Sequence, residues 1–280
     1  MKFKSVLTFI FIVFLILTPN NYPWGKVGHK LINKEAVSIL PPEMIAFKGW
    51  QDYLIDHAVD ADDRRKFDKT EPPKHYIDID FYKEFNSGRM IFDELQLESI
   101  YGDSTVKAIG LLPWATFETF NNLVDAFKEK NRDKTLIYAA DLAHYIADGH
   151  QPFHTCMNYN GQLTNQKGIH GRYEIDMINK YYDQILTMLT PDRVKYINDP
   201  FNYIFNYISN SNSVCNVILD ADNFAFNAVK NHDSDEYYRL LWFKTKYITT
   251  IQLTKASEDV ASLIYSAWVD AGKPDYKLFN

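Results

Sequence analysis

The sequence predicts an all-α fold organised as a single domain, a bundle of several helices. Apolar residues recur at helical spacing through most of the chain, and no run of alternating apolar and polar residues indicates a strand. Apolar residues make up 46% of the 280 residues, which is enough for one large core. No repeat or low-complexity linker divides the chain. We therefore expect one helical domain built around one core.

Six segments carry the helical pattern. The first, residues 29–40, places Leu31, Ile32 and Ala36 on one side and ends at Pro41 and Pro42. The second, residues 104–130, is helical on both sides of Pro113, where we expect a kink or a restart. The others are 133–152 (from a candidate N-cap at Asp133 to Gly149 and Pro152), 170–189, 217–230, and 235–271 as one helix or two.

Two long segments have no regular pattern. Residues 56–87 are polar and contain prolines, and residues 158–168 are similar in character. Loops of this length are uncommon inside compact domains and tend to be functional. The sequence thus predicts two long functional loops.

The N-terminus has the composition of a signal peptide. Lys2 and Lys4 precede an apolar run from Val6 to Leu17. As a helix this run is about 18 Å long, short of the roughly 30 Å of a bilayer core. We predict a signal peptide at residues 1–23, a domain at residues 24–280, and a secreted or periplasmic protein. The alternative is a membrane tether formed by an uncleaved N-terminal segment.

Composition leaves two questions open. A net charge of −6 gives no basic footprint for nucleic acid, although metal ions in a site could still attract phosphate. An exported protein could join its two cysteines, Cys156 and Cys215, in a disulfide, but the sequence does not show that they are close.

The stretch DLAHYIADGHQPFH, residues 141–154, has the spacing of a metal site. His144 and Asp148 are four residues apart and share one helix face, while Gly149 breaks the helix so that His154 can return from another direction. The pair His170 and Glu174 repeats the spacing of four. One such pair is more typical of a solvated ion pair. Two pairs with a histidine between them indicate a metal site, and imidazole with carboxylate suits zinc.

These motifs resemble the superfamily of zinc-dependent phospholipases C and S1/P1-type nucleases. The likeness also includes the motif W-G-x2-G-H at residues 24–29 and an irregular segment, residues 57–80, that contains a histidine and several aspartates. It implies an all-helical secreted phosphodiesterase with a buried trinuclear zinc site. Carried over to this chain, the zinc ligands would be Trp24 (free amine and carbonyl), His29, Asp60, His75, His144, Asp148, His154, His170 and Glu174.

Two of these assignments have open alternatives. Asp62 and Asp63 compete with Asp60 as the loop ligand. The Trp24 amine is free only if the signal peptide is cleaved directly before it, and Pro23 is a poor residue at that position. The exact cleavage site is therefore open.

The resemblance also implies a mechanism. A metal-bound hydroxide would attack the phosphorus, with Asp60 as the catalytic residue that orients the water or takes its proton. Asp148 would bridge two zinc ions, and the zinc on His154, His170 and Glu174 would stabilise the leaving oxygen. Three further histidines match no ligand position: His150, beside the site, and two expected at the polar surface, His57 and His232.

The substrate is less well determined than the metal site. His170-x3-Glu174 is similar to the phospholipase branch, whereas W-G-x2-G-H is similar to the nuclease branch. Ala61 stands where the phospholipases carry an aromatic residue, which argues against choline selectivity. We predict a phospholipase C-like enzyme acting on a phospholipid headgroup. The alternatives are a nuclease for single-stranded nucleic acid or 3′-nucleotides, and a non-catalytic zinc-binding protein. No obligate protein partner is implied, and the oligomeric state is left open.

Overall fold

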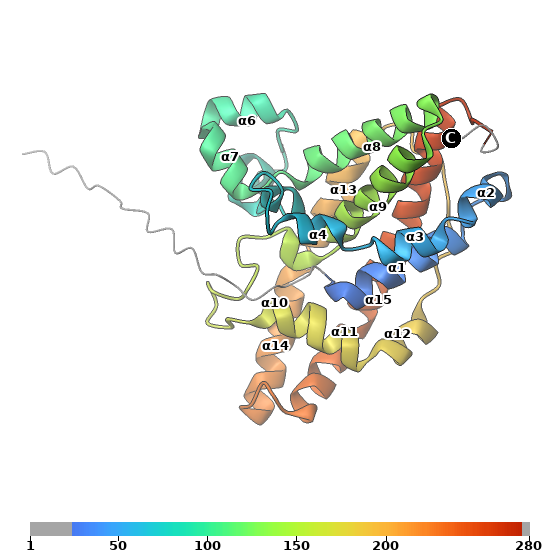
Figure 1. The fold of residues 1–280 in the computed structure, drawn as a ribbon. Coiled ribbons are helices and arrows are strands. Elements are labelled where there is room, and N and C mark those ends of the chain that lie inside the picture. The colour runs from blue at the N-terminus through green and yellow to red at the C-terminus, as the bar shows by residue number, and fades with distance from the viewer. Residues whose placement is uncertain (1–23, 276–280) are drawn as a thin grey trace, which may run out of the picture.

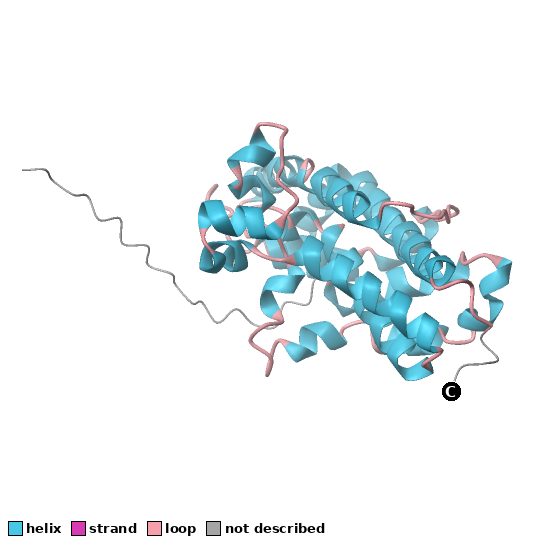
Figure 2. Ribbon diagram, turned by 90° about the horizontal axis from the view of Figure 1, so that it is seen from above, coloured by secondary structure: helices cyan, strands magenta, loops and turns pink. Residues whose placement is uncertain are grey.

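The computed structural model describes residues 24–275, and every regular element among them is a helix or a helical turn (Figures 1 and 2). The predicted all-α, single-domain class is confirmed, with no strand in the described part of the chain. The predicted signal peptide, residues 1–23, lies outside the described residues. Within residues 24–275, no helix combines the length and apolar character needed to cross a membrane.

The C-terminal helix α15, Asp235–Asp270, is the longest element and runs through the domain (Figure 1). The side chain of Ser234 caps its first turn by accepting a hydrogen bond from the backbone of Tyr237. The helix packs against α1 (Gly25–Ser38), α8 (Leu112–Glu129), α9 (Arg132–Gly149) and α14 (Cys215–Val229). The segment that the sequence left as one helix or two is therefore one.

Helices α8 and α9 form the other half of the core. They are joined by only two residues, and they contact each other along their length (Figure 1). The break expected near Pro113 is present. Helix α7 (Asp103–Ile109) ends before it, and Pro113 lies in the first turn of α8, which begins at Leu112. At this junction the backbone of Leu112 donates to the carbonyl of Tyr76, so the segment that carries His75 is attached to the start of α8.

Shorter helices complete the domain. Their bounds are α2 Ile45–Lys48, α3 Gln51–Asp56, α4 Asp60–Arg64, α5 Lys83–Asn86, α6 Glu94–Tyr101, α10 Ile169–Gly171, α11 Met177–Lys180, α12 Tyr182–Met188 and α13 Pro200–Asn212. Helical turns of other types lie between them: the 3₁₀ turns Pro42–Met44, Pro72–His75, Ile79–Phe81 and Pro152–His154, and the π-helical turn Arg172–Asp176.

The structure differs from the predicted elements in several places. The segment 170–189, predicted as one helix, is divided into α10, the π-helical turn, α11 and α12. Residues 56–87 are irregular only in part, since α4, α5 and two 3₁₀ turns lie there. Helix α13 was not predicted, although Asp199 caps it and Pro200 occupies its first turn. The N-cap of α9 is Asn131 rather than Asp133, because the Asn131 side chain accepts from the backbone of Lys134. Residues 158–168 form turns without a helix, as expected.

Candidate metal centre

Helix α9 carries the central pair of the site. His144 and Asp148 lie on one face of it, with His144 Nε2 3.3 Å from Asp148 Oδ2, and both side chains are buried. The Nδ1 atom of His144 lies 2.9 Å from the carbonyl oxygen of Ala58, to which it donates in the neutral tautomer that leaves Nε2 free. The helix then ends at Gly149, so the chain can turn back toward the same region.

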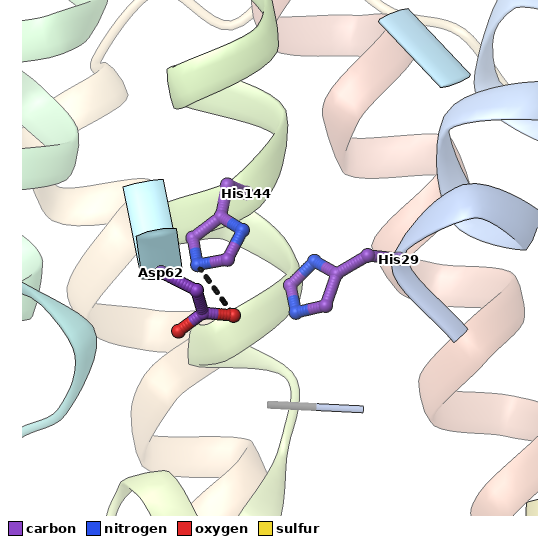
Figure 3. Close-up of side chains that lie close together, drawn as sticks. All are labelled: His29, Asp62 and His144. Atoms are coloured by element: carbon purple, nitrogen blue, oxygen red, sulfur yellow. Dashed lines mark ion pairs between the residues drawn. The ribbon is translucent and has the colours of Figure 1, made fainter. Parts of the chain in front are cut away.

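A first group of potential ligands is formed by His29, Asp62 and His144, from α1, α4 and α9 (Figure 3). Their ligand atoms all lie within 4.8 Å of one another. The two imidazole rings stack with centroids 4.2 Å apart and planes 8° apart, and His144 Nε2 is 3.8 Å from Asp62 Oδ2. Three elements that are far apart in the sequence thus direct nitrogen and oxygen atoms to one point.

A second group, His75, His144 and Asp148, shares a member with the first. His75 Nδ1 lies 3.0 Å from Asp148 Oδ2 and 3.1 Å from His144 Nε2. The other carboxylate oxygen, Asp148 Oδ1, is 3.4 Å from His29 Nε2. The two oxygens of Asp148 therefore face different histidines, an arrangement that suits a carboxylate between two metal ions.

The third group consists of His154, His170 and Glu174. His170 Nε2 is 2.8 Å and His154 Nε2 is 3.6 Å from Glu174 Oε2. Gln151 donates to the same oxygen at 2.8 Å. Glu174 lies in the π-helical turn Arg172–Asp176, a type of local widening that often occurs at functional sites.

The unpaired atoms of these groups fit zinc. His29 Nδ1 and Nε2, Asp62 Oδ2, Asp148 Oδ1 and Glu174 Oε1 are buried, and none of them has a hydrogen-bond partner among the described residues. A buried polar atom left unpaired costs about 1–3 kcal/mol, so several in one place point to a missing partner. Imidazole nitrogens and carboxylate oxygens are ligands that zinc takes.

Without metal, these side chains form buried ion pairs. Burial opposes the charged form of His144, but Asp148 and Asp62 outweigh it and raise the His144 pKa to about 9. Burial alone would raise the pKa of Asp148 as well, yet the neighbouring histidines hold it well below its usual value. In the third group, His170 and His154 likewise overcome burial and lower the Glu174 pKa to about 2. The carboxylates are thus kept ionised, as metal ligands must be.

The structure does not place Asp60, the predicted loop ligand, in any of these groups. Asp60 is about half exposed (47%) and pairs with His57 at 2.6 Å. Asp62 lies two residues further along α4, where the helical turn points it to the opposite side, and it is buried. Asp63 is also half exposed and pairs with Lys66. Asp62, which the sequence kept as an alternative, is the aspartate of α4 that faces the histidines.

Trp24 lies next to the site. Its side chain is buried and donates to the carbonyl of Ala147, the residue before Asp148. Ligation through its amine and carbonyl stays a prediction, because the residues before it are outside the described part. Gly28 allows Trp24 to pack closely against the first turn of α1, since a Cβ at position 28 would lie 2.8 Å from the Cβ of Trp24.

The histidines left over are placed outside the groups. His150 is buried and pairs with Asp259 of α15 at 2.9 Å. His57 pairs with Asp60, and His232 is partly exposed with Asp222 4.0 Å away. The sequence reasoning missed one charged neighbour of the site, Glu71, which lies 3.4 Å from His75. Its spacing of four from His75 was the available signal.

The two cysteines are buried and not bonded to each other. They are nevertheless neighbours, since the Cys215 thiol raises the pKa of Cys156, together with burial. Cys215 donates to the carbonyl of Pro152, at the turn that leads to His154. The pair therefore lies beside the turn that carries His154 of the third group, and both thiols are free in this structure.

A cavity of about 360 Å³ opens onto the site. Three histidines from two of the groups line it: His75, His154 and His170. Its other walls are formed by Arg65, Tyr76, Asp78, Ala108, Phe153, Tyr159 and Asn160. The cavity therefore gives a small molecule access to two groups of potential metal ligands at once.

The sequence of the chain matches the family described as zinc dependent phospholipase C over residues 28–263. The chain belongs to this family. Membership carries the general function, that of a phospholipase C-type hydrolase that cleaves phosphoester bonds, acts on phospholipids and depends on zinc. This family is part of the superfamily that the sequence motifs resemble, so the predicted resemblance is confirmed. Its dependence on zinc agrees with a site built from histidines and acids.

Among solved structures, the chain is similar to an alpha toxin from Clostridium absonum, with 12% identity and a TM-score of 0.47. The similarity covers 92% of this chain and 67% of the toxin. No curated protein sequence matches the chain significantly.

Proposed function

We propose that this protein is a zinc-dependent phosphodiesterase that hydrolyses the phosphate diester of a phospholipid headgroup. The observation that carries the proposal is the shared cavity of about 360 Å³, where His75, His154 and His170 reach the same space. A phosphate diester bound there would lie close to both sets of potential zinc ligands. One set would serve the water that attacks the phosphorus, and the other would serve the leaving oxygen.

The residues of this chain divide into two sets of zinc ligands in the proposal. One set is His29, Asp62, His75, His144 and Asp148, and the other is His154, His170 and Glu174. Trp24 would complete the first set if its amine is freed. Zinc bound by these sets supplies positive charge for the phosphate oxygens and lowers the pKa of bound water toward neutrality. We propose three ions, in line with three groups of ligands.

Asp62 takes the place of Asp60 as the proposed catalytic carboxylate. It is buried beside His29 and His144, and it has one oxygen, Oδ2, without a hydrogen-bond partner among the described residues. Arg65 holds the other oxygen at 3.0 Å and also lines the cavity. A carboxylate fixed in this way can orient a water molecule and accept its proton.

The cavity wall gives a role to the segment 158–168. Tyr159 and Asn160 line the cavity together with Arg65, so the loop would contact the bound headgroup. This supports one of the two predicted functional loops. Residues 56–87 supply the other wall through Arg65, Tyr76 and Asp78. We also retain the proposals that residues 1–23 are a cleaved signal peptide and that the protein is exported.

The test is a substrate panel with purified, processed protein. It compares a phosphatidylcholine analogue, a phosphatidylethanolamine analogue, single-stranded DNA and single-stranded RNA, each with and without a chelator. We expect hydrolysis of the phospholipid analogues that stops with chelator and returns with zinc. Asp62→Asn should lose at least about 100-fold in kcat/KM, and Asp60→Asn serves as the matched control on the same helix.

Three results would overturn the proposal. Hydrolysis that persists in chelator would remove the zinc mechanism. Cleavage of nucleic acid without cleavage of the phospholipids would favour the nuclease alternative. Zinc binding without turnover of any substrate would favour the non-catalytic alternative.

A further inference from the structure

The imidazole ring of His75 is oriented differently from the rings of His144 and His154. His144 and His154 each point Nδ1 at a backbone carbonyl oxygen, of Ala58 at 2.9 Å and of His75 at 2.7 Å, and turn Nε2 toward the acids. His75 has the reverse orientation. Its Nδ1 faces Asp148 at 3.0 Å, while its Nε2 points away from the site.

The atom that Nε2 of His75 faces is a carboxylate oxygen, Glu71 Oε1, at 3.4 Å. This Nε2 is buried and forms no hydrogen bond among the described residues, so the Glu71 carboxylate at 3.4 Å is the acceptor placed to receive one. Glu71 lies on the far side of the ring from Asp148, so it cannot share a metal ion with His75 through Nδ1. Its only route to the metal is through the imidazole.

Glu71 is itself held firmly. It is 1% exposed, it accepts a hydrogen bond from the Tyr145 hydroxyl, and Arg64 and Lys74 lie 3.3 and 3.2 Å from its oxygens. The guanidinium of Arg64 and the ammonium of Lys74 balance the charge of this carboxylate. A buried charge is retained only where it is paired, so this carboxylate has a fixed position.

We propose that Glu71 is a positioning residue that selects the Nε2–H tautomer of His75 and thereby presents Nδ1 to zinc. A neutral imidazole carries one proton, and the nitrogen that carries it cannot bind a metal ion. By accepting a hydrogen bond from the Nε2–H group, Glu71 keeps the proton on Nε2 and leaves the lone pair of Nδ1 free. It does for His75 what backbone carbonyls do for His144 and His154, and its charge makes His75 a more basic ligand.

The local sequence explains why a side chain takes this role. Glu71 directly precedes the 3₁₀ turn Pro72–His75, which begins with two prolines and ends with His75. The ring of His75 stands edge-on to the rings of both His144 and Tyr145, which fixes its plane but not which nitrogen carries the proton. In the proposal, the Glu71 carboxylate, which lies 3.4 Å from Nε2, decides which nitrogen carries the proton.

The proposal rests on the proposed zinc site but not on the substrate, and a zinc-binding assay tests it. Two variants separate positioning from packing: Glu71→Gln keeps an acceptor, and Glu71→Met keeps the volume without one. Zinc affinity is measured by titration against a competing chelator, with Glu118→Ala on the exposed face of α8 as control.

We expect Glu71→Met to weaken the zinc held by His75 about 10- to 100-fold, and Glu71→Gln to recover most of the loss. The spectrum of bound Co²⁺ should change in Glu71→Met and stay close to the parent in the control. Equal zinc affinity in the parent and Glu71→Met would overturn the proposal, as would equal losses in the two Glu71 variants.

A measurement on the unmutated protein covers the case in which Glu71→Met does not fold. In the zinc-loaded protein, ¹⁵N NMR of the imidazoles should show His75 with its proton on Nε2 and the metal on Nδ1, opposite to His144 and His154. A proton on Nδ1 of His75 would overturn the proposal. If the parent binds zinc but hydrolyses no phosphodiester, the proposed function fails while the role of Glu71 is still decided.

Discussion

The two halves of the site differ in how the chain builds them. The half formed by His154, His170 and Glu174 comes from one stretch of 21 residues, and its members meet through local turns. The other half joins α1, α4, a 3₁₀ turn and α9, whose ligands span residues 29 to 148. The first, which we call the local half, depends on local geometry. The second, the packed half, depends on the packing of the whole domain.

Accessibility follows the same division. In the half joined by packing, His29 and Asp148 have no exposed surface, whereas in the half formed by His154, His170 and Glu174 the side chain of His170 is 14% exposed and lines the cavity. The local half is therefore the one that meets the cavity more openly. We expect metal to exchange faster there, and the packed half to contribute more to the stability of the fold.

The largest effect is expected from Asp148→Asn. Asp148 contacts His29, His75 and His144 through two oxygens, so its loss disturbs both groups of the packed half. We expect the bound zinc to fall to the local half alone and kcat/KM to fall at least about 100-fold. Metal analysis after gel filtration, together with initial rates, measures this. Normal zinc content would show that Asp148 does not bridge.

A smaller change is expected from Glu174→Gln, which affects the local half. Gln151 and His170 can still contact the amide, but the charge opposite the two histidines is lost. The variant should keep the zinc of the packed half and its thermal stability, while kcat falls more than KM rises. A loss of all zinc would contradict the independence of the two halves.

The pH dependence of the metal-free protein tests the ion pairs of the packed half. The His144 pKa is about 9 in the fold and 6.5 in the unfolded chain, so its stabilisation is complete below pH 6.5 and is lost as pH rises through 9. The pKa of Asp148 is lowered from 3.8, so stabilisation from that carboxylate is lost as pH falls below about 4. Both contributions are complete between about pH 4 and pH 6.5, so we expect the Tm of chelated protein to be highest in this range.

Zinc should remove the alkaline part of this profile, because a metal ion takes the place of the proton on His144. Differential scanning calorimetry from pH 4 to 10, with and without zinc, makes the comparison. A flat Tm between pH 6.5 and 9 in the chelated protein would mean that the His144 and Asp148 pair is not formed without metal.

The smallest effect is expected from Asp60→Asn. Asp60 is about half exposed and pairs with His57 at the surface, an interaction of a kind that contributes at most about 1 kcal/mol. Activity and zinc content should stay within about twofold of the parent. A loss comparable to that of Asp62→Asn would restore Asp60 as the loop ligand.

The sequence was most informative where structure is local. The spacing of four between His144 and Asp148 and between His170 and Glu174 predicted side chains that do meet, because a helix fixes that geometry whatever surrounds it. Most of the long helices were also found. Helix α13 was missed although Ile204, Phe205 and Ile208 recur at helical spacing, since its many aromatic residues and asparagines have only moderate helix propensity.

The sequence was least informative where packing decides. Asp60 and Asp62 are both acceptable ligands by type, and only the orientation of the short helix α4 against α9 shows which of them is buried. The role proposed for Glu71 depends on which ring nitrogen of His75 faces inward, and no spacing along the chain determines that.

The most direct test of the account is anomalous X-ray diffraction at the zinc absorption edge from crystals of the processed protein. We predict peaks in both halves, one bounded by His154, His170 and Glu174, and others among His29, Asp62, His75, His144 and Asp148, at the 2.0–2.2 Å that zinc keeps from nitrogen and oxygen. Absence of anomalous density from both halves, in protein that hydrolyses a phospholipid, would contradict the account.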